Sequence, residues 1–351
     1  MRGMKNLENT IRALSDLRGI SGFEYRISDE IVNLFKPYCD EVKQDALGNI
    51  IALKKGNKGN KKIMLEAHCD EIGLLVSDID ENGFLSFVNI GGVDSRILPS
   101  AEVIVHGKRD IKGVIGAKPP HLQADGEEEK SSKLKDMAVD TGLPAEEVKK
   151  LVSIGDSITM KANCTELLGD KMSGKSLDDR ASIAAVITVL RNLKNENLDV
   201  DIYAVLAVKE EVGGVGAMTA TDSSNPDIAI AIDVCHGITP DNSKDAYEIG
   251  EGCVITVGPN IHPKISDRLI ATAKEKDIKN QLEAEGGNTG TDAWVMQVIG
   301  EGIPTGLLSI PLRYMHTSVE TISVADCKAV SDLLVEFIKG LDDRLEEWLC
   351  L

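Results

Sequence analysis

Several apolar runs in this chain end abruptly at charged residues. The clearest case covers residues 201–216 (DIYAVLAVKEEVGGVG), where an apolar run over residues 202–208 precedes Glu210 and Glu211. A strand buried on both faces of an α/β sheet needs such a continuous apolar run. The glycines that follow would let the backbone turn tightly, and ligand sites in open α/β sheets lie just beyond such strand ends. The pattern therefore predicts a buried strand with two carboxylates at its end.

The two glutamates are expected to differ in role. Neighbouring side chains on a strand face opposite sides of the sheet, so Glu210 and Glu211 would point in different directions unless the chain has already begun to turn. One carboxylate could then bind a metal ion while the other transfers protons. The simpler alternative is that both begin a solvated loop, because charged side chains are mostly exposed.

The remaining apolar pattern indicates an α/β fold. A second buried strand over residues 62–73 delivers His68 and Asp70 to its end, and further strands are predicted over residues 227–234, 253–257 and 305–310. Alternation around a turn predicts a hairpin over residues 41–54. Helical spacing of apolar residues predicts helices over residues 6–17, 24–35, 144–151, 181–193 and 324–345. We therefore expect a mixed central sheet flanked by helices.

The pattern changes between residues 74 and 165. Short alternating runs punctuated by glycine, such as residues 83–88, 103–107 and 113–116, favour a small β-rich barrel or sandwich. We expect a catalytic α/β domain formed by residues 1–73 and 166–351, with residues 74–165 as an inserted β-barrel-like domain. The alternative is a set of long excursions from the main sheet, although loops of this length seldom lack structure of their own.

Composition narrows the class of protein. A chain of 351 residues is long enough for two domains. Its 57 acidic and 39 basic residues give a net charge of −18, which argues against nucleic acid as a partner. The apolar runs are too short for a membrane span, and the first ten residues lack the apolar centre of a secretory signal, so we expect a cytoplasmic protein. Seven scattered cysteines without CxxC spacing fit reduced thiols.

Polar residues at the predicted strand ends and helix starts form a set with metal-binding chemistry. They are His68, Asp70, Asp178, Asp179, Glu210, Glu211, Asp233 and His316. Histidines and carboxylates without cysteine are typical ligands of zinc, cobalt or manganese in hydrolytic sites. One carboxylate could bridge two ions about 3.5–4 Å apart.

Each position has a simpler interpretation when taken alone. A histidine at a strand end is more often hydrogen-bonded structure than a ligand. Asp178 could cap a helix, and Asp233 could be a turn residue. Further histidines are available at His106, His121, His236 and His262. The joint interpretation is favoured because five separate segments each bring a ligand-type residue to such an end.

These motifs, in this order, resemble the cytosolic dinuclear metallo-aminopeptidases of the tetrahedral (TET), glutamyl and deblocking aminopeptidase family, whose members are often also described as endoglucanases. The resemblance rests on residues 67–73 (AHCDEIG), 177–180 (LDDR), 210–213 (EEVG), 232–233 (ID) and 314–320 (YMHTSVE), with residues 113–122 (GVIGAKPPHL) and 291–293 (TDA) in addition. It covers essentially the whole chain and implies a zinc-exopeptidase-like fold.

The resemblance also implies roles for individual residues. Two divalent ions per subunit, zinc, cobalt or manganese, would be held by His68, Asp178 and Asp233 and by Asp178, Glu211 and His316, with Asp178 as the bridge. Glu210 would be the general base that takes a proton from a metal-bridging water and returns it to the leaving amine. Asp70 would hydrogen-bond His68 and fix its tautomer, and Asp179 would follow a cis peptide bond.

Two features depart from the family pattern. Cys69 and Cys235 stand beside the expected ligands and are interpreted as buried core thiols, with soft-metal ligation as the alternative. The stretch over residues 286–292 (GGNTGTD) is less compact than the glycine run expected before TDA, and it leaves the substrate pocket undefined.

We expect a metal-dependent aminopeptidase that removes N-terminal residues from short peptides. An endo-1,4-β-glucanase is the alternative, but glycoside hydrolysis usually relies on aromatic stacking, and aromatic residues make up only 3% of this chain. A catalytically inactive peptide-binding protein is a third hypothesis, weakened because every expected ligand and Glu210 are present. The resemblance implies a homo-oligomer, from a dimer up to a tetrahedral dodecamer, with the inserted domain supporting assembly and substrate access; a monomer or simple dimer is the alternative.

Overall fold

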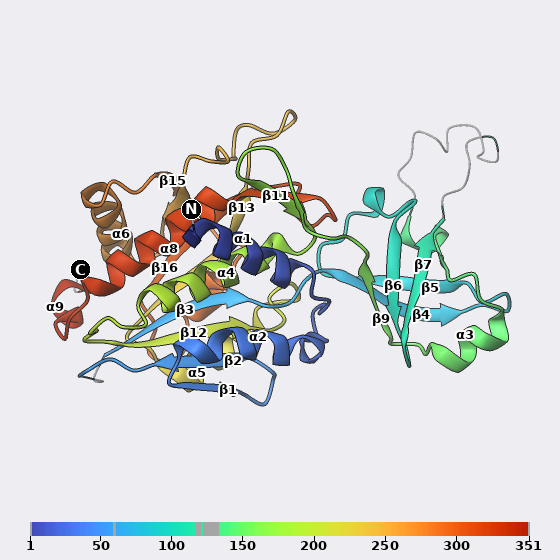
Figure 1. Cartoon of the computed structure of the whole chain (residues 1–351), viewed down its shortest axis with the longest axis horizontal. Coiled ribbons are helices and arrows are strands. Elements are labelled where there is room, and N and C mark those ends of the chain that lie inside the picture. The colour runs from blue at the N-terminus through green and yellow to red at the C-terminus, as the bar shows by residue number, and fades with distance from the viewer. Residues whose placement is uncertain (1, 59–60, 117–120, 122–132, 350–351) are drawn as a thin grey trace.

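The computed structural model describes residues 2–58, 61–116, 121 and 133–349. Figure 1 shows an α/β body and a smaller β-rich body beside it. The chain leaves the α/β body after β3 (Lys62–His68) and returns to it after β9 (Ser157–Met160). The smaller body is therefore a single insertion in the chain.

The α/β body contains, within the described residues, one sheet of eleven strands. They are β1 (Glu41–Gln44), β2 (Ile50–Lys54), β3, β10 (Thr165–Glu166), β11 (Lys171–Gly174), β12 (Asp201–Ala207), β13 (Ile228–His236), β14 (Cys253–Val257), β15 (Asn280–Ala284), β16 (Thr305–Arg313) and β17 (Glu320–Ser323). Its helices are α1 (Arg2–Ser15), α2 (Ser28–Phe35), α4 (Leu177–Asn192), α5 (Val215–Ser224), α6 (Pro263–Glu275), α7 (Ala293–Met296), α8 (Val324–Lys339) and α9 (Leu345–Leu349), with short 3-10 turns at Glu24–Arg26 and Lys36–Tyr38.

The sheet is mixed, as the sequence predicts, and its centre is parallel. The strand order is β1-β2-β12-β3-β13-β16-β17-β11-β10, and β14 joins β16 to β15 beside this path. Strands β12, β3, β13 and β16 run parallel to one another, with Ala207 opposite His68 and Asp233 opposite Ser309. The carboxyl ends of these four strands therefore meet at one edge, where open α/β sheets bind ligands.

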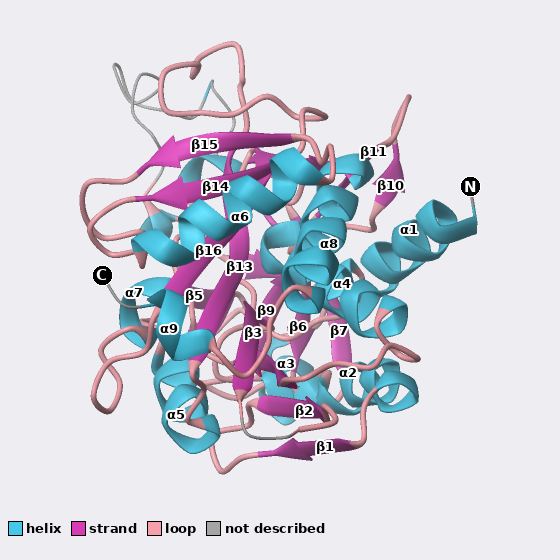
Figure 2. Cartoon of the chain, turned by 90° about the vertical axis from the view of Figure 1, so that its left-hand side faces the viewer, coloured by secondary structure: helices cyan, strands magenta, loops and turns pink. Residues whose placement is uncertain are grey.

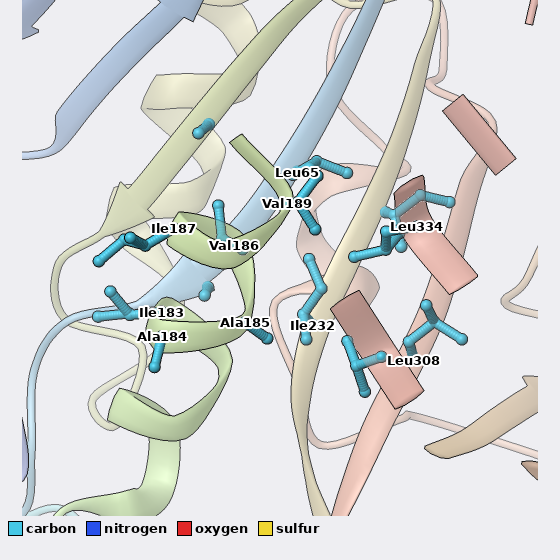
Figure 3. Close-up of a cluster of buried hydrophobic side chains, with 14 of the residues drawn as sticks. Leu65, Ile183, Ala184, Ala185, Val186, Ile187, Val189, Ile232, Leu308 and Leu334 are labelled. Atoms are coloured by element: carbon cyan, nitrogen blue, oxygen red, sulfur yellow. The ribbon is translucent and has the colours of Figure 1, made fainter. Parts of the chain in front are cut away.

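Side chains along the parallel strands alternate between two hydrophobic cores. Leu65 and Ile232 lie in the core that includes α4, α6 and α8. Met64 and Ala231 lie in the other core, with α5 and α7. Figure 2 shows these helix groups on either side of the sheet, and Figure 3 shows α4 packed over Leu65 and Ile232. Burial on both faces is the physical reason for the near-continuous apolar runs in the sequence.

The inserted segment forms a closed barrel with a core of its own. Its strands are β4 (Gly73–Ile79), β5 (Leu85–Ile90), β8 (Val139–Asp140), β7 (Asp110–Ile115), β6 (Glu102–His106) and β9, in barrel order. A helix, α3 (Ala145–Leu151), and 3-10 turns at Ser95–Ile97 and Leu134–Asp136 complete it. Buried Leu74, Val76, Leu85, Val105 and Ile158 fill the interior. The prediction of a small β-rich barrel is confirmed, and the long-excursion alternative is wrong.

Several predicted elements differ from those observed. The helix predicted over residues 24–35 begins with a 3-10 turn and becomes α-helical only at Ser28. The helix predicted over residues 324–345 ends at Lys339, because Gly340 caps α8 and the chain turns before α9. That turn brings Trp348 to the guanidinium of Arg268, 4.7 Å from the ring centre.

Part of the motif over residues 113–122 lies outside the described residues, which exclude 117–120 and 122. In the described part of the chain, none of the helices combines the length and apolar character that a membrane crossing requires.

Candidate metal centre and active site

The predicted site residues converge at the carboxyl edge of the parallel strands. His68 is the last residue of β3, and Asp233 lies near the end of β13. Glu210 and Glu211 follow β12, and His316 follows β16. A fifth segment supplies Asp178, which stands at the start of α4, close to the same edge. Five segments that are distant in sequence therefore supply one site.

The two glutamates lie on a tight turn and not on the strand. Strand β12 ends at Ala207, and Lys209 adopts a left-handed φ of 61° before the turn that leads into α5. Asn49 fastens both ends of this turn: Oδ1 accepts from the N–H of Val208 at 3.0 Å, and Nδ2 donates to the carbonyl of Gly216 at 3.0 Å.

Glycine is required where this turn closes. A Cβ on Gly216 would lie 2.1 Å from the backbone oxygen of Val208, so only glycine permits the close approach. Opposite orientations of Glu210 and Glu211 were predicted only for the case that the chain had not yet turned. The chain has turned at these residues, so that case does not apply. The two glutamates nonetheless differ in surroundings.

The described residues form two groups that could hold a metal ion, and the groups share Asp178. One group is His68, Asp178 and Asp233, and the other is Asp178, Glu211 and His316; in each, the ligand atoms all lie within 4.8 Å of one another. Oδ1 of Asp178 lies 3.0 Å from Nε2 of His68, whereas Oδ2 lies 3.4 Å from Nε2 of His316. The two oxygens of one carboxylate thus face different groups, which is the geometry of a bridge.

Glu211 and Glu210 take different places around this bridge. Oε1 of Glu211 lies 3.2 Å from Nε2 of His316, inside the second group. Glu210 belongs to neither group, but Oε2 lies 4.0 Å from Nε2 of His68, and the side chain lines the cavity beside both groups. A carboxylate next to the metal groups, but outside them, is placed to handle protons.

Asp70 fixes the turn that carries the glutamates. It is fully buried, and its two oxygens accept hydrogen bonds from the backbone N–H groups of Glu210 at 3.1 Å and Glu211 at 3.2 Å. The hydroxyl of Ser21 donates to Oδ2 at 2.5 Å. Oδ1 also lies 3.5 Å from Nδ1 of His68, which is long for a hydrogen bond. Asp70 therefore contacts two ligand-bearing segments at once.

Asp179 and Glu320 hold the backbone of the other ligands. The peptide bond between Asp178 and Asp179 is cis, as the family resemblance implies. Oδ2 of Asp179 accepts from the N–H of His68 at 3.2 Å. Glu320, which is buried, accepts from the N–H of Asp178 at 3.1 Å and from the N–H of His316 at 2.9 Å. These carboxylates link β3, α4 and the loop after β16.

Burial dominates the electrostatics of the site. It raises the pKa of Asp233 to about 8 and the pKa of Glu210 to about 9, and neighbouring carboxylates add to both shifts. Burial alone would lower the pKa of His316, but its contacts with Asp178 and Glu211 raise it to about 11. The pKa of His68 is also raised well above its ordinary value, because Asp178 and Asp70 outweigh the effect of burial.

The donor set fits divalent cations. Carboxylates this close together repel one another. Without a metal ion, protons on the two histidines offset the negative charge of the carboxylates. Divalent ions bind such oxygen and imidazole donors by displacing those protons. The arrangement therefore matches the predicted chemistry of zinc, cobalt or manganese without selecting among them.

A cavity of about 540 Å³ opens beside the two groups. Thr289, Gly290 and Thr291, from the stretch whose role the sequence left undefined, line it. Cys235 also lines the cavity, whereas Cys69 is buried in the main core, and neither belongs to a metal group of the described residues. Among the described lining residues there is no Trp, Tyr or Phe.

Sequence reasoning gave no role to several buried carboxylates near the site. Glu66 lies within β3, and Asp292 precedes α7; Oε1 of Glu66 and both oxygens of Asp292 are buried without a hydrogen-bond partner among the described residues. Burial raises the pKa of Asp292 to about 7. The sequence signal that could have pointed to Glu66 is a glutamate inside an otherwise apolar run, KIMLEAH. Glu320 lay within the quoted YMHTSVE motif, but its contacts depend on the fold.

Comparison with known proteins gives a consistent result. The family model of the M42 glutamyl aminopeptidase matches residues 48–333. The chain is 38% identical over 334 residues to a lysyl aminopeptidase of Pyrococcus furiosus, covering 93% of this chain and 94% of the relative.

Solved structures are similar over nearly the whole chain. A TET aminopeptidase from a marine-sediment Thaumarchaeota archaeon superposes with a TM-score of 0.93 at 30% identity, with 100% of both chains covered. The TET1 peptidase of Pyrococcus horikoshii, which can assemble into a tetrahedron or a large octahedral shell, superposes with a TM-score of 0.84 at 30% identity, covering 95% of this chain and 100% of that one.

Proposed function

The chain belongs to the M42 glutamyl aminopeptidase family and is a peptidase, and on this premise we propose that it is a metal-dependent aminopeptidase acting on short peptides. The observation that carries the proposal is the position of Asp178, whose two oxygens face two separate groups of ligand atoms. A carboxylate shared in this way suits two divalent ions a few ångströms apart, the arrangement of dinuclear aminopeptidases.

We assign the metal ligands from these groups. His68, Asp178 and Asp233 would hold one ion, and Asp178, Glu211 and His316 the other. Ions held there would act as Lewis acids on the scissile carbonyl and the attacking water. Asp70 and Asp179 support the ligands through the backbone contacts described above.

Glu210 is the proposed general base. It borders the cavity, belongs to neither ligand group, and its backbone is fixed by Asp70. Its carboxylate takes a proton from the attacking water and delivers that proton to the leaving amine as the peptide bond breaks. The high pKa of Glu210 in its buried setting suits a group that must hold this proton between the two steps, and nearby cations would bring it closer to neutrality.

We further propose that residues 74–165 act as an inserted domain for assembly and substrate access, with the catalytic domain formed by residues 1–73 and 166–351. The closed barrel with its own core supports this division. The similarity to a peptidase that assembles into closed shells supports a homo-oligomer. Light scattering of the purified protein tests it: a monomer at micromolar concentration would contradict the proposed assembly.

A glucanase function has less support from the site. Glycoside hydrolases usually stack sugars on aromatic side chains, and the described lining of the cavity offers none. The deciding experiment is a panel of aminoacyl p-nitroanilides and a soluble glucan, assayed before chelation, after chelation and after return of zinc, cobalt or manganese. We expect aminoacyl cleavage that chelation abolishes and metal restores. Cleavage of the glucan alone, unaffected by chelation, would refute the proposal.

A further inference from the structure

One wall of the cavity carries three acidic residues that the metal centre does not use. Glu283 and Glu285 come from the end of β15 and the residue after it, and Asp245 comes from the loop between β13 and β14. Together with Asp178, Glu210, Glu211 and Asp233 they make seven carboxylates among the described lining residues. The sequence analysis assigns no role to these three residues.

The acidic wall, defined as Asp245, Glu283 and Glu285, is built on ordered elements. Glu283 and Glu285 are two residues apart on an extended segment, so their side chains share a face. The hydroxyl of Thr256 donates to Oε2 of Glu283 at 2.7 Å, and the N–H of Gly287 donates to Oε1 of Glu285 at 2.9 Å. Among the described residues, the other oxygen of each carboxylate has no hydrogen-bond donor.

The loop that carries Asp245 is fastened to the same strand. The amide of Gln281 on β15 makes two hydrogen bonds to the backbone of Glu248, at 3.0 and 2.9 Å. The backbone of Tyr247 bonds to His236 and Ile238. Partial burial, together with the charges of Glu283, Asp245 and Glu285, raises the pKa of Tyr247 to about 12, which agrees with all three carboxylates lying around this loop.

The charge of the wall is not balanced within the described part of the chain. Two divalent cations would offset Asp178, Glu210, Glu211 and Asp233, but they leave the wall with three negative charges. No lysine or arginine appears among the described lining residues, and none of the described ion pairs involves the wall. A cavity lined by one sign of charge concentrates ligands of the opposite sign.

The wall does not have the geometry of a third metal site. Its carboxylates are absent from the groups of described residues whose ligand atoms all lie within 4.8 Å of one another. Carboxylates spread along one wall suit an extended organic cation better than a compact ion. The positively charged side chain of a substrate residue next to the cleaved bond is an extended organic cation of this kind.

We propose that the acidic wall selects substrates whose N-terminal residue is lysine or arginine. The inference rests on the proposed aminopeptidase function, since the wall borders the cavity that contains the candidate metal centre. In this arrangement the α-amine and scissile bond lie at the metal groups, while the cationic side chain extends to Glu283, Glu285 and Asp245. A glutamyl substrate would meet repulsion at the same place.

The test compares lysyl with norleucyl p-nitroanilide, because norleucine has the same methylene chain as lysine without the charge. We expect the metal-loaded wild type to favour lysine by about tenfold or more in kcat/KM, with glutamate poorest, as expected for charge-assisted contacts. In the double variant Glu283→Gln, Glu285→Gln, kcat/KM for the lysyl substrate should fall until most of the preference is lost. The value of kcat/KM for the norleucyl substrate should change little. Glu248→Gln is the matched control, since this exposed residue lies in the same loop but does not line the cavity.

The outcomes separate the two proposals. Metal-dependent turnover that prefers the norleucyl or glutamyl substrate would refute selection by the acidic wall. It would not contradict the proposed aminopeptidase function. An unchanged lysine preference in the double variant would also refute selection by the acidic wall. Failure to cleave any aminoacyl substrate would count against the aminopeptidase itself, and calorimetric titration with L-lysinamide and L-norleucinamide then tests the wall by binding alone. If lysinamide binds more tightly than norleucinamide, and added salt weakens its binding, selection by the acidic wall is supported. Equal binding of the two ligands would refute it.

Discussion

Lys175 and Glu71 form a buried ion pair, with 2.8 Å between Nζ and Oε2; Glu71 lies where the chain leaves the α/β body for the barrel, and Lys175 lies between β11 and α4. Both side chains are less than 5% exposed. Lys175 also donates to the carbonyl of Leu17, and Glu71 accepts from the N–H of Gly19 at 3.0 Å. The pair therefore joins the segment that leaves the α/β body, the turn between β11 and α4, and the loop after α1.

Breaking this pair should destabilise the protein strongly. In Lys175→Met the carboxylate of Glu71 stays buried without its cation, and we expect the free energy of unfolding to fall by about 3–5 kcal/mol. Urea unfolding at fixed protein and metal concentration measures the change. The double variant Glu71→Leu, Lys175→Met removes both charges and should recover much of the loss. If the double variant were no more stable than Lys175→Met, the unpaired charge would not be the cause.

Glu210→Gln should abolish turnover without emptying the metal centre. The amide cannot accept the proton, and loss of a general base typically costs about 10²–10⁴-fold in kcat. Metal content by atomic absorption should match the wild type, because Glu210 lies outside both ligand groups. Retained activity would remove Glu210 from the role of base, and lost metal would make it a ligand.

The shared carboxylate predicts unequal effects on metal content. Asp178→Ala removes a ligand atom from both groups and should reduce bound metal from the proposed two ions per subunit to nearly none. His316→Ala affects only the second group and should leave about one ion. Equal losses in the two variants, after circular dichroism has shown both to be folded, would argue against the bridge.

The barrel should contain a pH-dependent contribution to stability. His106 is buried, and Nδ1 lies 2.7 Å from Oδ1 of Asp110 while Nε2 lies 2.9 Å from Oγ1 of Thr159. Burial lowers its pKa below the ordinary 6.5, although Asp110 opposes the shift. His106 therefore binds a proton more readily in the unfolded chain than in the folded chain. The free energy of unfolding consequently decreases as the pH falls through about 6.5.

Thermal melts from pH 7.5 to pH 5.5 measure this effect. The wild type should lose more stability on acidification than His106→Gln, which cannot titrate. His121→Gln makes the same change at an exposed position and should follow the wild type. Parallel curves for all three proteins would show that His106 does not contribute.

Much of the catalytic edge could be predicted because its residues follow strands with unmistakable apolar runs. His68 and Asp233 belong to strands buried on both faces, and burial imposes that pattern on the sequence. The convergence of His316 and Asp178 was also within reach, because parallel strands end at one edge. The amphipathic helix α6 and the short strands β15 and β17 were not predicted, although they carry or support parts of the cavity.

The acidic wall could not be predicted, for a physical reason. Glu283 and Glu285 lie on a half-exposed strand at the side of the sheet, where alternating charged residues are ordinary. Their importance depends on the pairing of β15 with β14 and on the loop that carries Asp245, and both are tertiary relationships. The turn at Glu210 shows the same limit: the carboxylates were found from sequence, but their orientation depends on Asn49 and Asp70.

The two neighbouring connections of the barrel have an evolutionary consequence. Because the start of β4 pairs with β9, the chain departs and returns at neighbouring points, and the inserted segment forms one separate unit. Lineages can lengthen, reshape or exchange it without altering the register of β3 against β12 and β13. With the role proposed for the inserted domain, such changes would alter substrate access and subunit contacts and leave the residues of the candidate active site in place.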